Sequence, residues 1–242
     1  MFFKENFRVN LSMLNKSNLI TNKSILTMLQ DIAEMHSSSV GFGVTDLNTT
    51  HCSWALLNWK LEIFSRPKYG DVITIKTWAR YNTKLYCYRD FEILNSNGDV
   101  IGIATSKWVL FNIATGRIEK IEDELISKYN SEDKSVFNIV DLPKLNELDT
   151  YEYSKNYTIR KADIDINNHV NNLAYMDIVT EILPDNFIDN ELNNIEIMYK
   201  KQIKLEDSIE VYYGITENNE NSVVIKNSDG SVHAIIDRKS VV

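Results

Sequence analysis

The chain repeats itself, and this repetition is the feature that most restricts its fold. F-E-I-L-N-S-N-G-D-V-I at residues 91–101 is matched by V-V-I-K-N-S-D-G-S-V-H at residues 223–233. Likewise, K-Y-G-D-V-I-T-I at residues 68–75 is matched by K-L-E-D-S-I-E-V at residues 204–211. The surrounding order, one helix and then several strands, also recurs, and such runs of strands are typical of α+β proteins. The sequence therefore predicts two copies of a unit made of one helix and an antiparallel sheet.

The elements of the first copy are predicted from the spacing of its apolar residues. Residues 3–9 predict a short strand, and apolar residues recur at helical spacing over residues 22–40. Thr21 or Asn22 can cap the start of this helix, and Gly41 stands where a helix commonly stops. Strands are then expected over residues 57–63, 72–79, 85–94 and 100–111, with a hairpin turn at residues 96–99.

A polar, acidic stretch over residues 121–150 separates the two copies, and a helical turn is expected near residues 122–129. In the second copy, strands are expected over residues 151–160, 195–203, 208–215 and 222–226 and from residue 232. The predicted domains are an N-terminal unit over residues 1–125, a linker over residues 126–148 and a C-terminal unit over residues 149–242.

Composition and charge narrow the class of protein. The 242 residues include 26 Lys and Arg against 34 Asp and Glu, a net charge of −8. This balance argues against nucleic acid as a partner, because phosphate binding relies on basic residues. Cys52 and Cys87 are too few for a disulfide framework, which favours a reducing compartment. Because no apolar run reaches membrane-spanning length and the N-terminus lacks a signal-peptide core, we expect a cytoplasmic protein without membrane insertion.

Residues 161–179, K-A-D-I-D-I-N-N-H-V-N-N-L-A-Y-M-D-I-V, concentrate acids, amides and a histidine just before an amphipathic helix. If residues 162–170 are extended, successive side chains point to opposite faces. One face then carries the polar residues Asp163, Asp165, Asn167 and His169. The other face carries Ile164, Ile166 and Val170, with Asn168 as the exception. A carboxylate, an amide and an imidazole on one face can act together as a general-base cluster.

The helix that follows this run adds to the catalytic interpretation. Asn171 suits the N-cap position, and the free backbone N–H groups of a helix start suit a developing oxyanion. The same run can also be a loop in which Asp and Asn side chains form Asx-turns. Residue spacing alone leaves both interpretations open.

A family resemblance favours catalysis. D-I-N-N-H-V-N-N-L-A-Y at residues 165–175 resembles the D-x-N-x-H-V-N-N-x-x-Y signature of acyl-acyl carrier protein (acyl-ACP) thioesterases. Segments of the first half also resemble this family, at residues 29–36, 54–63, 66–78 and 106–117. The resemblance covers essentially the whole chain. It implies an α+β protein with two tandem hotdog folds, each a long helix wrapped by an antiparallel sheet.

By this resemblance, Asp165, Asn167 and His169 are the catalytic set of an enzyme that hydrolyses fatty acyl-ACP thioesters. Plant members carry a glutamate and then a cysteine in the strand after the helix, where this chain has Gln202 and Ile203. An amide at Gln202 can orient a water molecule but cannot deprotonate it. Base catalysis then falls to Asp165 or His169, and the hypothesis adopted is Asp165 as the base, directly or through His169. Direct attack by Asp165 to give an anhydride is the alternative that the sequence leaves open.

The remaining positions are assigned supporting roles. Backbone N–H groups near Asn171 and Asn172 are expected to bind the oxyanion, and Asp163 is expected to be structural. His36, on the apolar face of the first helix, is expected to pack in the interior. The candidate acyl pocket is formed by Met28, Leu29, Ile32, Trp54, Leu57 and Trp59.

The expected partner is acyl-loaded acyl carrier protein. Because both proteins are acidic and do not attract each other at long range, docking requires a local basic patch on this chain. The candidate residues are Arg160, Lys161, Lys200, Lys201 and Lys204. We expect no cofactor beyond the phosphopantetheine carried by the substrate, and no metal, because the four histidines show no ligand spacing. The other functions considered are an acyl-CoA thioesterase, a hotdog hydratase or dehydratase, and a non-catalytic acyl-binding module. Pairing of two chains into a homodimer stays open.

Overall fold

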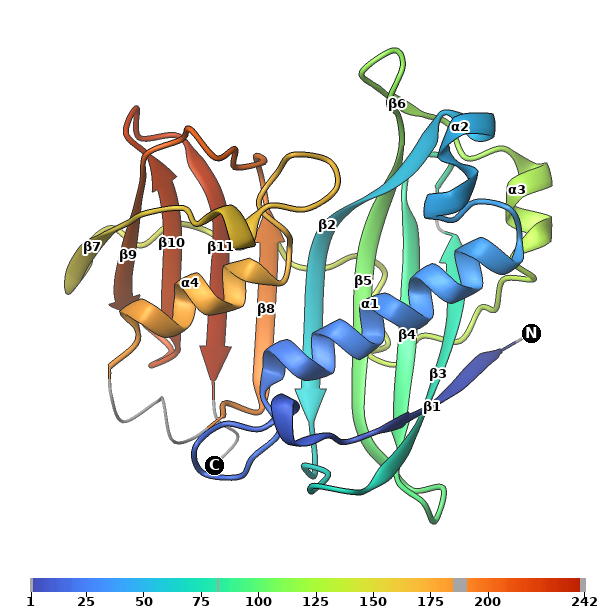
Figure 1. The fold of residues 1–242 in the computed structure, drawn as a ribbon, viewed down its shortest axis with the longest axis horizontal. Coiled ribbons are helices and arrows are strands. Elements are labelled where there is room, and N and C mark those ends of the chain that lie inside the picture. Colours follow the sequence, from blue (N-terminus) through green and yellow to red (C-terminus); the bar gives the residue numbers. More distant parts are fainter. Residues whose placement is uncertain (1, 82, 185–190, 240–242) are drawn as a thin grey trace.

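Each half of the chain has one main helix and five main strands (Figure 1). A computed structural model describes residues 2–81, 83–184 and 191–239. The first half contains β1 (Phe3–Arg8), η1 (Leu11–Met13), α1 (Asn22–Ser39), η2 (Val44–Asp46), α2 (Leu47–Thr50), β2 (Cys52–Ile63), β3 (Val72–Tyr81), β4 (Cys87–Leu94), β5 (Val100–Asn112), β6 (Arg117–Glu119) and α3 (Asp123–Lys128). The second half contains β7 (Tyr153–Tyr157), η3 (Lys161–Asp163), α4 (Ala174–Ile182), β8 (Asn194–Tyr199), β9 (Ile209–Ile215), β10 (Asn221–Asn227) and β11 (Val232–Lys239).

The order of the strands in the sheet confirms the predicted duplication. The strands are arranged β1-β3-β4-β5-β2-β8-β11-β10-β9-β7, so the second half repeats the order of the first in reverse. The two halves join where β2 pairs with β8 in antiparallel register, with Trp59 opposite Ile197 and Leu61 opposite Ile195. The result is one continuous sheet with two α+β units, the arrangement expected of two hotdog folds.

The two main helices lie on the same face of this sheet (Figure 1). At the start of α1 the Thr21 side chain accepts the Ser24 N–H, and beyond its end Gly41 adopts a φ of +78°. These features confirm the predicted start and stop of the helix. The apolar stripes of α1 and α4 pack against the sheet in one core that extends through both halves. No helix in the described part of the chain is long and apolar enough to cross a membrane.

Two predicted strands are shorter than expected. The strand predicted over residues 195–203 ends at Tyr199 as β8, because the N–H groups of Lys200 and Lys201 both donate to the carbonyl oxygen of His233. Two donors on one acceptor interrupt the regular ladder, so the chain leaves the sheet there. The strand predicted over residues 151–160 is confined to β7, which pairs with β9 at one edge of the sheet.

After α3 the connection between the halves crosses the sheet face opposite α1. Trp78 Nε1 donates to the Lys134 carbonyl at 2.7 Å, and Asp141 Oδ1 accepts from Tyr88 Oη at 2.5 Å. Further along, the Lys226 ammonium pairs with Glu147 at 2.6 Å. The expected boundary at residue 125 falls inside α3, whose Leu125 side chain packs on the first half.

Candidate active site

The polar run before α4 is a compact loop, so of the two interpretations left open for residues 162–170 the extended one does not hold. The Asp165 N–H donates to the His169 carbonyl at 2.8 Å, and Ile164 and Val170 form an isolated antiparallel bridge. Asp165 Oδ1 accepts the N–H groups of Asn167 at 2.8 Å and His169 at 3.2 Å. Asn168 has a φ of +60°, a conformation that asparagine tolerates well. The structure therefore has the Asx-turn of the alternative interpretation, and Ile166, which is 76% exposed, lines the same cavity as Asp165 and Asn167 rather than lying on the opposite face.

A buried carboxylate anchors the start of this loop. Asp163 accepts from the Arg160 side chain at 2.7 Å, from the Arg160 N–H at 2.8 Å and from Tyr157 Oη at 3.1 Å. Burial acts to raise the pKa of Asp163, but the hydrogen bonds from Arg160 outweigh it and hold the pKa below its usual value. These contacts fit the structural role expected of Asp163.

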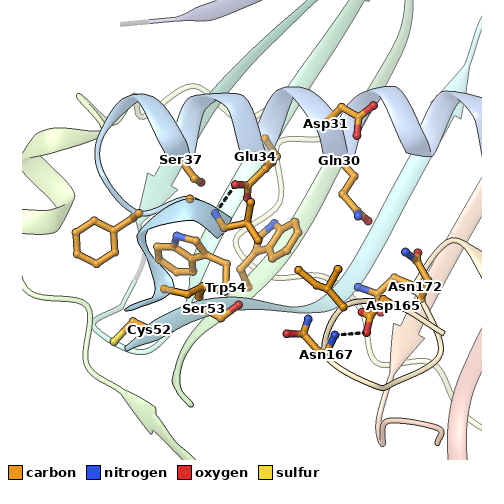
Figure 2. A pocket seen from close by; sticks show the side chains of 18 of the residues that line it. Gln30, Asp31, Glu34, Ser37, Cys52, Ser53, Trp54, Asp165, Asn167 and Asn172 are labelled. Atoms are coloured by element: carbon orange, nitrogen blue, oxygen red, sulfur yellow. Dashed lines mark hydrogen bonds between the residues drawn. The ribbon is translucent and has the colours of Figure 1, made fainter. Parts of the chain in front are cut away.

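A cavity of about 670 Å³ lies between this loop and α1. Asp165, Asn167, Asn171 and Asn172 line it from the second half (Figure 2). From the first half it is lined by Gln30, Asp31, Ala33, Glu34 and Ser37 on α1, and by Phe42, Val44, Cys52, Trp54, Cys87, Arg89 and Trp108 among others. Its volume is within the range of small-molecule sites, and both halves contribute walls.

Two of the three expected catalytic side chains line this cavity. Asp165 and Asn167 do so, whereas His169 is not among the lining residues. The Nδ1 atom of His169 is buried without a hydrogen-bond partner, and among the described residues the bond between His169 and the Asp165 side chain comes from the His169 backbone N–H and not from its imidazole. Gln202 is exposed beyond the end of β8, and it too is not a lining residue. Ile203 is buried, and its carbonyl accepts the Val170 N–H at 2.8 Å.

The oxyanion donors expected at the helix start are only partly available. The Asn171 N–H already donates to the Asp163 carbonyl at 2.8 Å, which excludes it as a donor to substrate. Helix α4 begins at Ala174 with Leu173 as its N-cap residue, so the predicted N-cap at Asn171 is wrong. Asn171 caps the preceding turn instead, where its Oδ1 accepts the Leu173 N–H at 2.8 Å. Among the described residues, the Asn172 N–H has no acceptor.

Most of the expected acyl-pocket residues are core residues. Of the six, Trp54 lines the cavity, Met28, Leu29, Ile32 and Trp59 are buried in the hydrophobic core, and Leu57 is half-buried and does not line the cavity. The most apolar face of α1 packs on the sheet, and the cavity opens along its flank, where Gln30, Ala33, Glu34 and Ser37 recur at helical spacing. That i, i+3, i+4, i+7 pattern of small and polar residues is the signal in the sequence that could have indicated the cavity.

A buried cation that sequence reasoning missed also lines the cavity. The Arg89 side chain is 4% exposed, and its Nη1 lies 2.9 Å from His36 Nδ1 and 3.4 Å from Thr77 Oγ1. Its guanidinium also lies over the Tyr129 ring, 5.6 Å from the centroid. Burial and the neighbouring Arg89 charge lower the pKa of His36 to about 3, so His36 is a neutral interior residue. Its contacts agree with the packing role expected for it.

The first half contains a copy of the site loop with different side chains. Asn15 Oδ1 accepts the N–H groups of Ser17 at 2.9 Å and Leu19 at 3.1 Å, and the Asn15 N–H donates to the Leu19 carbonyl at 2.8 Å. Asn18 has a φ of +58°, and Leu14 bridges Ile20. The backbone of the loop is thus duplicated, but the acid and the imidazole are present in the second copy alone.

Sequence comparisons match both halves to the same kind of protein. The family model described as the acyl-ACP thioesterase N-terminal domain matches residues 1–129, and that of the C-terminal domain matches residues 146–239. Oleoyl-acyl carrier protein thioesterase 1 of Arabidopsis thaliana is 30% identical over 225 residues, 86% of this chain and 62% of the relative. The oleoyl-acyl carrier protein thioesterase of Coriandrum sativum is 31% identical over 225 residues, 86% of this chain and 61% of the relative. The chain thus spans less than two thirds of the length of these relatives.

Solved structures share the fold at lower sequence identity. An acyl-ACP thioesterase from Bacteroides thetaiotaomicron superposes with a TM-score of 0.87 at 21% identity, covering 98% of this chain and 97% of that one. The 12:0-ACP thioesterase from Umbellularia californica gives a TM-score of 0.83 at 21% identity, covering 98% and 96%. The whole architecture, with both halves in one chain, is therefore shared with these proteins.

Proposed function

We propose that this chain, which belongs to the acyl-ACP thioesterase family, hydrolyses fatty acyl-ACP thioesters to free fatty acid and holo-acyl carrier protein. The observation that carries this proposal is the placement of Asp165 in the wall of a cavity of about 670 Å³ that extends along α1. A carboxylate in the wall of a partly apolar cavity suits the hydrolysis of a long acyl thioester.

The acyl chain would run along the flank of α1. Gln30 and Ser37 both line the cavity, and seven residues of helix span about 10 Å. Towards the Ser37 end the lining includes Phe42, Trp54 and Trp108, which supply apolar surface for a tail. The scissile bond would then lie at the Asp165 end, beside the loop from the second half (Figure 2).

In the proposed reaction Asp165 acts as the general base. It takes a proton from a water molecule whose oxygen bonds to the thioester carbonyl carbon, giving a tetrahedral oxyanion. When the intermediate collapses, the carbon–sulfur bond breaks and the proton on Asp165 passes to the leaving thiolate of phosphopantetheine. Asn167, on the same turn, would position the water or the carbonyl. Asn172 would donate its free N–H to the oxyanion.

The His169 side chain takes a lesser part in this proposal, and Gln202 takes none. The backbone of His169 shapes the Asx-turn that holds Asp165, so substitution of its side chain leaves those hydrogen bonds intact. If Asp165 acts through the imidazole, His169→Ala lowers kcat nearly as much as Asp165→Asn does. If the base acts directly, His169→Ala retains most of the activity. Gln202 lies outside the cavity, and we assign it no contact with the water.

Acyl carrier protein would dock on basic residues beside the loop. Lys161, Lys200, Lys201 and Lys204 are all exposed, and the Val170–Ile203 hydrogen bond of 2.8 Å holds the lysine-bearing segment against the site loop. Arg160 is less available, because it pairs with Asp163 at 2.7 Å and lies 3.4 Å from Asp177. This patch gives an acidic partner a local cationic surface on a chain of net charge −8.

The test is hydrolysis of acyl-ACP, followed as released thiol. Asp165→Asn keeps an oxygen that accepts the Asn167 and His169 N–H groups but removes the base, so we expect kcat to fall about 10²–10⁴-fold with the fold intact. The matched control is Asp71→Asn, because Asp71 also accepts a turn N–H, from Lys68 at 2.8 Å, on a remote exposed turn. Absence of thiol release by the wild-type chain over a range of acyl lengths would reject the proposal. Release from acyl-CoA but not from acyl-ACP would reject its choice of substrate.

A further inference from the structure

A carboxamide from the first half faces the site loop of the second half and has no hydrogen-bond partner. Gln30 lies on α1 and lines the cavity, and Figure 2 shows its side chain extending from the helix towards the loop that carries Asp165 and Asn172. Its Oε1 is buried without a partner, and within the described part of the chain no hydrogen bond is made by either end of its amide. Because buried polar groups in proteins are nearly always hydrogen-bonded, an unpaired carboxamide in a cavity wall points to a polar ligand, and its uncommitted Nε2 group is available to donate to an acceptor atom of that ligand.

The electrostatics of the cavity call for a neutral donor at this position. Asp31, Glu34 and Asp165 line the cavity, and burial raises the pKa of Asp31. The cation among the lining residues is Arg89, which is held against His36, about 9 Å further along α1 than Gln30. Among the described residues that line the cavity, an oxyanion formed beside Asp165 would therefore meet carboxylates and no cation other than Arg89.

The supply of backbone donors is also short. The Asn171 N–H is taken by the Asp163 carbonyl, which leaves the Asn172 N–H at the start of the helical turn. Oxyanion holes generally combine two or more donors aimed at the developing charge. The structure has room for a second donor from the opposite wall, and Gln30 is the side chain that extends there (Figure 2).

We propose that Gln30 is a catalytic residue whose Nε2 group donates a hydrogen bond to the thioester carbonyl oxygen, together with the Asn172 N–H. The bond strengthens as the carbonyl becomes an oxyanion. This proposal rests on the proposed function and deepens it. Both halves of the chain would then contribute to the reaction centre, because the second half supplies the base and the first half supplies a hydrogen-bond donor to the carbonyl oxygen. The glutamine side chain that acts in the reaction is then Gln30 and not Gln202, which is exposed.

The test compares Gln30→Met, which has nearly the same shape but no donor, with Gln202→Met as the matched control. For Gln30→Met we expect kcat on acyl-ACP to fall about 10²–10³-fold, with KM changed less than about threefold and the unfolding midpoint unchanged. Gln202→Met should retain wild-type kcat. Gln30→Glu, which replaces the donor with a negative charge, should be at least as impaired as Gln30→Met.

A binding experiment separates electrophilic assistance from a structural role. Two acyl-pantetheine analogues are used: a thioether without a carbonyl, and an α,α-difluoro ketone with a methylene between the carbonyl and the sulfur, whose hydrate mimics the tetrahedral intermediate. Gln30→Met should bind the thioether as the wild type does and the ketone more weakly, by the same factor as the loss in kcat/KM. Equal losses for both analogues, or unchanged ketone affinity, would overturn the proposal. The affinities for the two analogues can be measured even if the wild-type chain hydrolyses no substrate. Failure of the proposed activity and failure of the Gln30 assignment are therefore distinguishable.

Discussion

Asn15 and Asp165 hold the same turn in the two halves of the chain. In each case the side-chain Oδ1 accepts the N–H groups of the second and fourth residues that follow, at 2.9 and 3.1 Å for Asn15 and at 2.8 and 3.2 Å for Asp165. An amide and a carboxylate are therefore interchangeable as far as the turn is concerned. Asp165 lines the cavity, and Asn15 does not.

The equivalence of the two turns leads to an exchange experiment. The double variant Asn15→Asp, Asp165→Asn keeps one acid and one amide, and each can still accept the N–H groups of its turn. We expect it to fold with an unfolding free energy within about 1 kcal/mol of the wild type, because the turn contacts are retained. We also expect no hydrolysis, because the acid no longer faces the cavity. Calorimetry and thiol release measure the two outcomes, and recovery of turnover would show that the second copy is not required.

Charge reversal at Lys200 and Lys201 tests the docking patch. Replacing both with Glu should raise KM for acyl-ACP, because an acidic partner loses its local attraction, and should leave KM for acyl-CoA unchanged. The effect on acyl-ACP should shrink as ionic strength rises, because exposed charges are screened. A charge-matched control reverses Lys4 and Lys144, which are exposed elsewhere on the molecule. Equal changes in KM for acyl-ACP and acyl-CoA would show that these lysines do not form the docking site.

The path of the acyl tail along α1 is tested at Ala33. Its side chain is 5% exposed and lines the cavity between Gln30 and Ser37. Ala33→Phe places a ring in the middle of this path, so kcat/KM should fall steeply for long acyl chains and be retained for short ones. The control is Met35→Phe on the same helix, because Met35 is 44% exposed and does not line the cavity. A uniform loss over a chain-length series would mean that the tail lies elsewhere.

The neutral state of His36 predicts a pH dependence of stability. Its pKa is about 3 in the folded chain, against an ordinary value of 6.5, because burial and then the Arg89 charge disfavour the cation. Between these values the unfolded chain binds a proton that the folded chain does not, so stability falls as pH falls below 6.5, by about 1.4 kcal/mol per pH unit. Urea unfolding of the wild type and of His36→Gln should show a shallower decline in the variant between about pH 6.5 and about pH 5. Equal slopes would show that His36 is protonated in the folded chain.

Repetition and helix signals in the sequence were sufficient to predict the fold. The N-cap at Thr21, the glycine stop at Gly41 and the matched hairpins of the two halves all have local causes that act over a few residues. The pairing of β2 with β8 has no such local signal. This pairing depends on how the two folded halves meet. Other strands with alternating apolar residues in either half could equally have formed the edge through which the halves pair.

The site loop shows why the rest was missed. The alternation of acids and isoleucines around Asp165 is the pattern of a half-buried strand, but the side chain of Asp165 competes for backbone N–H groups and closes a turn instead. The sequence places Gln202 in the site because it follows Tyr199 on a predicted strand. In the folded chain this strand ends at Tyr199, and Gln202 lies outside the sheet. Gln30 lies about 170 residues from Gln202 in the sequence, and only the folded chain brings it to the opposite wall of the cavity.

The ladder between β2 and β8 has a consequence for how such a chain can evolve. In a dimer of two identical subunits that paired through these strands, every mutation would alter both subunits, so the two sites would have to stay the same. Joining the copies in one polypeptide removes this constraint: Asn15, Ser17 and Leu19 keep the shape of the loop, while the acid and the imidazole are carried by Asp165 and His169 in the second half. The first half is then free to change its side chains around the cavity independently.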